Sequence, residues 1–304
     1  MMRTRRSTTA VPTAITVAAG ALAVSLGLSG CTIGDVDSSS RSASGSASPT
    51  AEQSASPNPT EPGEGSASAS TGPVEGASMA GSEVLSALPD GVDMAIGNGV
   101  HSNNGVAVPP WSTIKVPIAI AAFRNDSAAA QPYVAPAITQ SSNEAAAQLW
   151  ASLGDPSRAA TLTEQVISEG KSSATVQTKV VRPGFSSFGQ SDWSVPEQAT
   201  FASNLRCIQG SEPVTKYMGQ IASGGGYGLG IIPGALFKGG WGPDESGNYG
   251  ARQFGLVPNG AGKFVAVALA ATSPDGTMEG AQARLTEAVK ILQPVLGELP
   301  TAAC

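Results

Sequence analysis

Three short polar motifs follow one another along the middle of the chain, and their side chains are suited to act together on an acyl group. They are Ser112-Thr113-Ile114-Lys115, Ser141-Ser142-Asn143 and Lys238-Gly239-Gly240. A serine hydroxyl is a weak nucleophile at neutral pH and needs a base within about 2.6–3.2 Å. Lys115, one helical turn after Ser112, can supply that base if burial beside a second cation favours its neutral form. The first motif therefore predicts a serine nucleophile with a lysine base.

Another serine and the single histidine offer competing explanations. Ser168-Glu169-Gly170-Lys171 repeats the spacing of the first motif, but it lies at the polar end of a stretch that stops at Gly170, so we interpret it as a helix end. Ser112 instead opens an apolar run over residues 116–123. His101 lies in a Gly/Asn-rich turn with no serine placed beside it by spacing. This disfavours a Ser-His-Asp triad and predicts an exposed turn residue.

The second and third motifs also have purely structural explanations. Ser141-Ser142-Asn143 has the composition of a helix N-terminal cap. Lys238-Gly239-Gly240 fits a solvated lysine at a glycine-rich kink in a strand. Both structural explanations remain open. In the catalytic alternative, Lys238 lies beside the substrate cleft and is the second cation near Lys115.

The pattern around the motifs predicts the elements that would position them. Residues 91–97 alternate like a strand, and Asn98-Gly99 predicts a hairpin. Ser194-Val195-Pro196-Glu197 is a capping box that begins a helix. Periodicity predicts helices over 113–125, 143–153, 155–169, 196–208 and 278–296, and strands over 235–241, 250–257 and 263–270. We therefore expect an α+β fold, in which N- and C-terminal strands form one antiparallel sheet flanked by helices, with an inserted all-helical lobe.

The N-terminal residues have the organisation of an export signal. Arginines precede an uncharged apolar stretch over residues 14–28, which is shorter than the ~20 residues of a membrane span. Leu28-Ser29-Gly30-Cys31 resembles the lipobox of bacterial lipoproteins, which implies cleavage of residues 1–30 and acylation of Cys31. An uncleaved N-terminal membrane anchor is the alternative. We therefore expect an extracytoplasmic protein, anchored to the cell membrane by a lipidated Cys31.

A long segment of low complexity follows the signal. Residues 31–80 consist mainly of Ser, Ala, Gly and Pro with almost no large apolar side chain, so we expect a disordered tether. At about 5–6 Å × √n, its r.m.s. reach is roughly 40 Å. The remaining residues, 81–304, are enough for one substantial core and form the expected folded domain.

Charge and cysteines restrict the partners and the compartment. Removal of residues 1–30 with their three arginines takes the formal net charge from −6 to −9, because every acidic residue lies later in the chain. Such an acidic chain is a poor ligand for nucleic acid, and we expect no nucleic-acid partner. With Cys31 lipidated, Cys207 and Cys304 can pair in an oxidising compartment or remain as two free thiols.

The three motifs in this order resemble the signature of class A β-lactamases and penicillin-binding proteins. The similarity extends over residues 91–296 and is densest over 137–156, which is similar to the family's second-motif loop, the helix that follows and a Gly-x-Pro turn. The resemblance implies a β-lactamase-like domain that is acylated on Ser112 by a small-molecule or peptidoglycan-derived acyl substrate. It requires no metal ion and no cofactor, and we expect none.

The resemblance also implies a role for each polar residue. Ser141 would relay protons, and Asn143 would bind the substrate amide. The motif Lys238-Gly239-Gly240 would bind the substrate, with its lysine attracting a carboxylate. The backbone N–H of Trp241 would join that of Ser112 as an oxyanion hole, and one such donor typically contributes about 3–4 kcal/mol to the transition state.

Two departures from the family pattern bear on the chemistry. Gly239 lacks the hydroxyl that the family has in the middle of its third motif. Residues 179–193 contain no glutamate to activate a hydrolytic water, and Asp192 is their only acid. Glu197 follows shortly after, but its place in the capping box explains its presence without a catalytic role. We therefore expect a lipid-anchored serine hydrolase or acyl-transferase that deacylates poorly. The alternative is a catalytically inert binding lipoprotein of the cell envelope that retains the fold.

Overall fold

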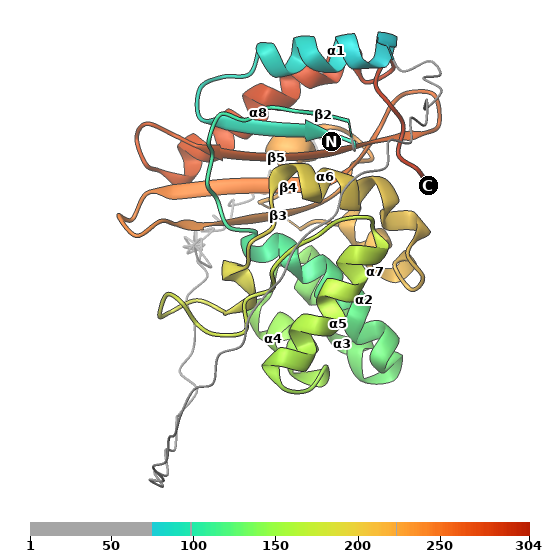
Figure 1. Ribbon diagram of the computed structural model, residues 1–304, viewed down its shortest axis with the longest axis vertical. Helices are drawn as coiled ribbons and strands as arrows, with labels where there is room; N and C mark the ends of the chain where they lie inside the picture. The colour runs from blue at the N-terminus through green and yellow to red at the C-terminus, as the bar shows by residue number, and fades with distance from the viewer. Residues whose placement is uncertain (1–74, 98, 223) are drawn as a thin grey trace, which may run out of the picture. The chain divides into compact units, whose positions relative to one another are not determined.

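The computed structural model describes residues 75–97, 99–222 and 224–304 (Figure 1), and it describes side chains from residue 79 onward. The expected signal over residues 1–30, the expected lipidation site Cys31 and nearly all of the expected tether lie outside this part. Helix α1 (Glu75–Ser86) crosses the domain boundary expected at residue 81. Within the described part, no helix combines the length and the apolar character that a membrane crossing requires.

A five-stranded antiparallel sheet in the order β2-β1-β5-β4-β3 forms the central layer (Figure 1). The first two strands pair antiparallel, as the predicted hairpin requires, and the first strand pairs with the last, so N- and C-terminal segments share one sheet as predicted. The strands are β1 (Val92–Ile96), β2 (Val100–His101), β3 (Leu236–Pro243), β4 (Tyr249–Pro258) and β5 (Phe264–Thr272).

Both faces of the sheet are buried, because alternate residues of each central strand contribute to two different cores. On β5, Ala266, Ala268 and Ala270 face one core, whereas Val267 and Leu269 face the other. The small residues face the helical lobe and allow helix α6 to lie close to the sheet. The branched residues pack against α1 and the C-terminal helix α8, which cover the opposite face (Figure 1).

The helices divide between the two faces of the sheet (Figure 1). α1 and α8 (Met278–Leu292) lie on one side, and α6 (Val195–Asn204) lies against β5 and β1 on the other. The side chains of Asp155, Ser194 and Thr277 cap the helices that follow them, as the sequence predicts for Ser194. The inserted lobe consists of α2 (Lys115–Asn125), α3 (Ser127–Thr139), α4 (Asn143–Ser152), α5 (Pro156–Glu169) and α7 (Glu212–Met218).

Three helices were not predicted from the sequence. One is α1, whose first residues fall within the expected disordered tether. α3 contains Pro132 and Pro136, which lack the N–H of a helical hydrogen bond and so weaken the pattern. The Asp126 carboxylate nevertheless starts this helix by accepting a 3.1 Å hydrogen bond from the Ala129 N–H, and α2 and α4 pack along it. α7 has only 7 residues, too few for a periodic pattern. The helix predicted over 196–208 is also shorter than expected, because it ends at Asn204 and continues as a 3₁₀ turn.

A disulfide joins Cys207, just after α6, to Cys304 near the end of the chain. Their Cα atoms are 5.5 Å apart, within the normal range for such a bond. The sequence left open whether these two cysteines pair or remain free thiols, and the structure contains the paired state. The bond closes a separation of 97 residues and ties the C-terminal segment to the helix that covers the sheet.

Candidate active site

Ser112 lies in a 3₁₀ turn, η1 (Trp111–Ile114), that leads directly into α2. This turn packs so closely on β3 that only glycine fits opposite it. A Cβ on Gly240 would lie 2.6 Å from the carbonyl oxygen of Pro110 and 2.8 Å from the backbone nitrogen of Ser112. A Cβ on Gly242 would lie 2.5 Å from the Trp111 ring. The glycines of β3 therefore set the distance between the strand and the serine.

Backbone strain occurs in the second motif and at the residue directly before the first motif. Trp111 has φ +46° and Ser141 has φ +55°, a region that non-glycine residues rarely adopt. Among the described non-glycine residues only Lys171, just after α5, shares it. Each such residue costs on the order of 1–3 kcal/mol and persists where its surroundings fix it, which is typical of functional sites.

A buried polar layer supports the segment that carries Ser112. Arg252 on β4 donates from Nη1 to the carbonyl oxygen of Val108 at 2.5 Å. Gln198 on α6 donates from Nε2 to the hydroxyl of Thr113 at 2.7 Å, and Thr113 donates to the carbonyl of Pro110 at 2.5 Å. Removal from water lowers the pKa of the Arg252 guanidinium to about 9. Side chains of β4 and α6, two elements distant in sequence, therefore hold the Ser112 segment in place.

Some polar atoms in and beside this layer have no hydrogen-bond partner. In the part of the chain that the structure describes, four buried side-chain atoms lack a hydrogen-bond partner: Trp111 Nε1, Gln198 Oε1, and Arg252 Nε and Nη2. All four belong to residues in the Ser112 segment or bonded to it. An unpaired buried polar atom costs about 1–3 kcal/mol, so this segment keeps its conformation against a measurable free-energy cost.

The two serines of the second motif have different hydrogen-bond partners. Ser142 is the N-cap of α4, and its side chain accepts a 3.1 Å hydrogen bond from the Ala145 N–H. The expected cap role therefore falls on Ser142. Ser141 instead accepts from Lys238 Nζ at its hydroxyl, at 2.8 Å. Asn143, the first residue of α4, accepts from Lys115 Nζ at Oδ1, also at 2.8 Å.

The two lysines connect all three motifs. Lys115 Nζ also donates to the carbonyl oxygen of Ser141 at 2.6 Å, and Lys238 Nζ donates to the carbonyl oxygen of Gly239 at 2.8 Å. Lys115 is 1% exposed, Lys238 3% and Ser112 6%, so Lys238 is not a solvated lysine at a strand kink. The structure thus brings Lys115, Ser141, Asn143 and Lys238 into one hydrogen-bonded cluster beside the turn of Ser112.

The remaining third-motif residues lie along the edge strand β3. Gly240 faces the Ser112 segment, whereas Gly239 and Trp241 face the other side of the sheet because side chains alternate. The Trp241 ring is half-buried and packs against Tyr249, with ring centroids 6.1 Å apart. β3 pairs only with β4 and is therefore an edge strand of the sheet.

The carboxylates near the site have structural roles. Only half of the expected capping box forms: the Glu197 N–H donates to Ser194 Oγ at 3.3 Å. Its carboxylate accepts from the Ser173 N–H at 2.6 Å rather than reaching back to Ser194. Asp192 is exposed, and its backbone bridges to that of Thr175. Neither observation gives residues 179–193 or the start of α6 a general base.

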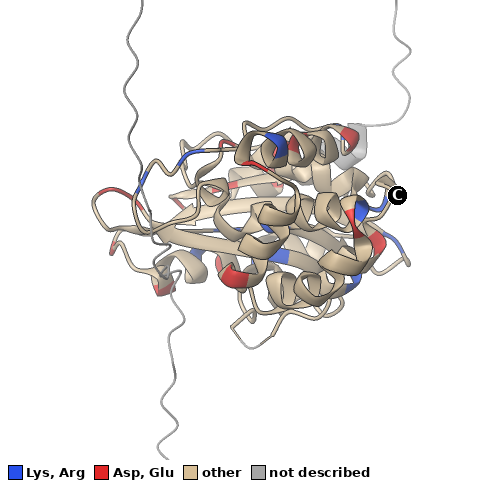
Figure 2. Cartoon of the chain, turned by 90° about the horizontal axis from the view of Figure 1, so that it is seen from below, with Lys and Arg blue, Asp and Glu red and all other residues tan. Residues whose placement is uncertain are grey.

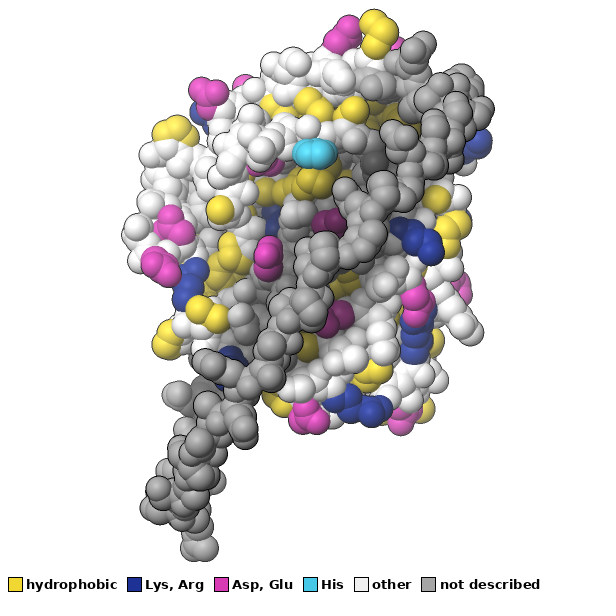
Figure 3. Space-filling view, viewed as in Figure 1, with side chains coloured by type: hydrophobic (Ala, Val, Ile, Leu, Met, Phe, Trp, Pro, Cys, Tyr) yellow, Lys and Arg dark blue, Asp and Glu magenta, His cyan; other side chains and the backbone are white. Residues whose placement is uncertain are grey.

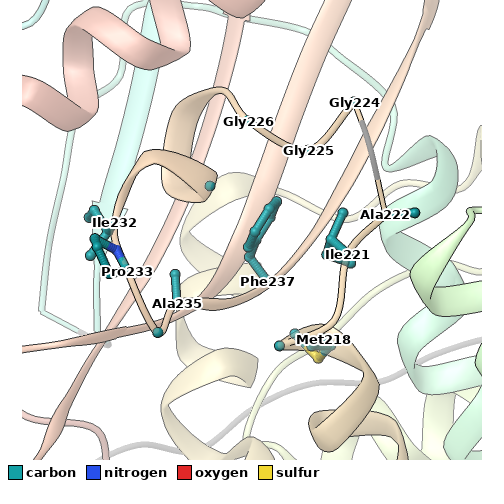
Figure 4. A pocket seen from close by; sticks show the side chains of 13 residues that line it. Met218, Ile221, Ala222, Gly224, Gly225, Gly226, Ile232, Pro233, Ala235 and Phe237 are labelled. Atoms are coloured by element: carbon teal, nitrogen blue, oxygen red, sulfur yellow. The ribbon is translucent and has the colours of Figure 1, made fainter.

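Two other candidates, a histidine and a pocket, lie apart from the cluster. The only histidine side chain, His101, is exposed at the surface on β2 (Figure 3). A pocket of about 490 Å³ lies beside the loop before β3, where Ile221 and Phe237 face it (Figure 4). Phe237 neighbours Lys238 on β3 and so points to the opposite face, which separates this pocket from the lysine cluster. The described residues contain no group of three or more side chains suited to hold a metal ion.

Charged side chains are interspersed over the described part of the chain (Figure 2). The strongest exposed ion pair joins Arg124 to Glu169 at 2.6 Å, and its hydrogen bonds lower the pKa of the glutamate. This pair connects α2 to the end of α5, next to the repeat at Ser168. Ser168 therefore lies at a helix end, as the sequence predicted for that repeat.

Comparison with known proteins identifies the fold. No protein-family model matches the chain, and no curated protein does. Among solved structures, TLA-3 extended-spectrum β-lactamase is 13% identical, with a TM-score of 0.59 over 73% of this chain and 100% of that one. A class A β-lactamase from Bacteroides cellulosilyticus is 14% identical, with a TM-score of 0.58 over 73% and 98%. A β-lactamase from Chitinophaga pinensis is 14% identical, with a TM-score of 0.55 over 71% and 98%. At such identities the likeness shows the fold, which is the expected β-lactamase-like α+β fold.

Proposed function

We propose that this protein is an extracytoplasmic, lipid-anchored serine hydrolase or acyl-transferase that is acylated on Ser112. The observation that carries the proposal is the meeting of two buried lysines at Ser141. Lys115 donates to its carbonyl oxygen at 2.6 Å, and Lys238 donates to its hydroxyl at 2.8 Å. Burying an amine is costly unless it is well bonded, so two of them side by side favour a chemical purpose.

Lys115 is suited to act as the base in acylation. A neutral amine has two N–H bonds and one lone pair. The Ser141 carbonyl and the Asn143 side chain can accept the two N–H bonds, and the lone pair can then accept the proton of Ser112. As that proton moves to Lys115, the Ser112 oxygen forms a bond to the substrate carbonyl carbon. The carbonyl electron pair moves to oxygen, and it returns when the leaving group departs with a proton.

The second lysine supports this role in two ways. The positive charge of Lys238 disfavours a second charge on Lys115 nearby, which favours the neutral amine. Lys238 also fixes the hydroxyl of Ser141, so that this hydroxyl can pass a proton to the leaving group. The close approach of Gly240 to the Ser112 nitrogen supports an oxyanion site between β3 and η1, with the Trp241 N–H as the second donor.

Ser112→Ala should abolish covalent labelling by a fluorescent penicillin or a fluorophosphonate, because the attacking oxygen is lost. Ser168→Ala is the matched control, since Ser168-Glu169-Gly170-Lys171 repeats the motif spacing at a helix end. It should label like the parent protein. In-gel fluorescence on folded protein measures both variants. Equal labelling of the Ser112 variant and the parent would remove Ser112 as the nucleophile.

The inert binding lipoprotein is the second candidate, and two observations favour it. Gly239 carries no hydroxyl, and of the two nearby acids the Glu197 carboxylate binds the Ser173 N–H while Asp192 is exposed. Such a protein would bind an acyl compound at the cleft without forming an ester. Failure of every acylating probe on folded parent protein would select this candidate.

Cys31→Ala should leave unprocessed precursor and abolish incorporation of labelled fatty acid, because the proposed lipid is attached to that residue. The reason is the sequence Leu28-Ser29-Gly30-Cys31 followed by a low-complexity segment. Cys304→Ala is a useful control, since Cys304 is paired in the fold and far along the chain. Continued lipid labelling of the Cys31 variant would rule out the proposed anchor.

A further inference from the structure

Arg182 joins the loop of residues 179–193 to the end of β3. Its guanidinium donates from Nη1 to the carbonyl oxygen of Pro243 at 2.6 Å and from Nη2 to that of Asp244 at 3.4 Å. The first distance is that of a charge-assisted hydrogen bond, whereas the second is long and weak. Arg182 therefore connects this loop to the strand that carries the third motif.

The same guanidinium lies over the ring of Trp111, the residue directly before Ser112. Its central carbon is 5.5 Å from the centre of the Trp111 ring and 4.9 Å from that of Phe185, both within the range of a cation–π contact. The two rings also pack on each other, with centroids 5.2 Å apart. Because β3 approaches the Trp111 ring closely at Gly242, this ring lies between the loop and the strand and is only 4% exposed.

Gln190 fixes the part of the loop that carries Arg182. Its Oε1 accepts from the Arg182 N–H at 2.7 Å. Its Nε2 donates to three carbonyl oxygens, those of Arg182 and Phe185 at 3.3 Å and that of Ser186 at 3.1 Å. The backbone of the loop is thus closed on itself, so the side chains of Arg182 and Phe185 present a fixed surface to the Trp111 ring.

The Trp111 backbone depends on these ring contacts. Its φ of +46° lies in a region that tryptophan rarely adopts, and such a conformation persists only where the surroundings hold it. Within the described part of the chain, the indole N–H has no hydrogen-bond partner, so packing and the cation–π contact hold the ring. If the ring were released, the backbone would relax toward a common conformation and displace Ser112, which follows it directly.

We propose that Arg182 is a positioning residue for acylation, which acts through the Trp111 ring to hold the hydroxyl and the backbone N–H of Ser112 in their reactive places. This rests on the proposed function, in which Ser112 is acylated. A shift of about 1 Å in a reacting atom can cost about 10²-fold in rate. The effect falls on the acylation step rather than on affinity, because the donors of Arg182 are already engaged by β3.

The rate of labelling by a fluorescent penicillin, measured over a range of concentrations on the full chain, tests this. Arg182→Ala should lower the limiting rate about tenfold or more and change the half-saturating concentration by less than about twofold. Arg182→Lys should remain nearer to the alanine variant than to the parent, because an ammonium lacks the planar fork that lies over two rings and bonds to β3. Arg206→Ala is the matched control, since the Arg206 guanidinium also lies 5.5 Å from a ring, that of Phe264, outside the three motifs. It should label at the parent rate.

Hydrogen exchange measures the same coupling without requiring acylation. The Thr113 N–H, which donates to the Pro110 carbonyl at 2.9 Å, reports on the Ser112 turn. In Arg182→Ala, peptides covering residues 111–115 should exchange faster together with those of the loop, whereas peptides of α8 should not change. Faster exchange in the loop alone, or an unchanged limiting rate of acylation, would overturn the proposal. Absence of labelling in the parent would contradict the proposed function instead, and exchange at residues 111–115 would still decide whether Arg182 holds this turn.

Discussion

Lys115→Met is expected to slow acylation of Ser112 by about two to four orders of magnitude, the usual contribution of a positioned general base. Methionine has a similar length and no charge, so the buried position stays filled. The variant loses the lone pair that would accept the serine proton. It also leaves the Ser141 carbonyl and Asn143 Oδ1 without their Lys115 donor, which should reduce stability by about 1–3 kcal/mol.

The measurement is the rate of labelling by a fluorescent penicillin, with the melting temperature recorded for the same preparations. Lys171→Met is the matched control, because Lys171 has the same spacing from Ser168 but is exposed just after a helix end. It should label at the parent rate. A Lys115 variant that is folded and labels within a few-fold of the parent would assign the base to another group.

Much of the scaffold could be predicted because its signals are local. The Ser194 capping signal predicts a helix start, and Asn98-Gly99 predicts the hairpin of the first two strands, which pair. The strands of the C-terminal half alternate or end at turn residues within a few positions. By contrast, α3 owes its existence to packing between α2 and α4, which outweighs the weak helical preference of its two prolines.

The lysine cluster lies at the limit of what motifs can predict. The order of the motifs suggested that Lys115, Ser141, Asn143 and Lys238 share a site, and the structure places them in one hydrogen-bonded group. The position of the Ser112 hydroxyl follows only indirectly, from its turn.

The supporting residues could not be predicted, because their partners are distant in sequence. Arg252 and Val108 are separated by 144 positions, and Gln198 and Thr113 by 85. One signal was present: Arg252 and Gln253 interrupt a strand whose other side chains are small or apolar. A charged residue in such a strand is expensive to bury, so it marks a place where the fold needs a polar contact.

The choice between an enzyme and an inert binding protein depends on the free-energy costs of residues in and beside the motifs. Strained residues at Trp111 and Ser141, four unpaired buried polar atoms and two buried lysines all lie in or beside the three motifs. Each lowers the free energy of unfolding. A binding protein could lose them and gain stability, since function would then require only shape and a surface charge. Their presence together favours the enzyme.

The proposed acyl-enzyme on Ser112 is expected to persist, because Lys115 is the proposed base for acylation while neither Glu197 nor the acid of residues 179–193 is placed for deacylation. Glu197 binds the Ser173 N–H, and Asp192 is exposed beside Thr175. A slow second step traps the ester. Intact-mass spectrometry after incubation with a β-lactam should show an adduct on Ser112 that survives removal of free ligand. Rapid steady turnover of a chromogenic cephalosporin by the unmodified protein would contradict this.

A carboxylate added to the neighbouring loop should shorten the life of that adduct. Gly189 is a suitable position, because a Cβ there would lie 3.7 Å from the Trp111 ring and so face the Ser112 segment. Its nearest neighbour would be Ser186 Oγ at 3.0 Å, the end of a side chain that can rotate away. Gly189→Glu can bring a base toward a hydrolytic water, whereas Gly189→Gln has the same shape without the basic oxygen. Faster loss of the adduct in the glutamate variant alone would identify the missing base as the limit, and equal lifetimes in both variants would place the limit elsewhere.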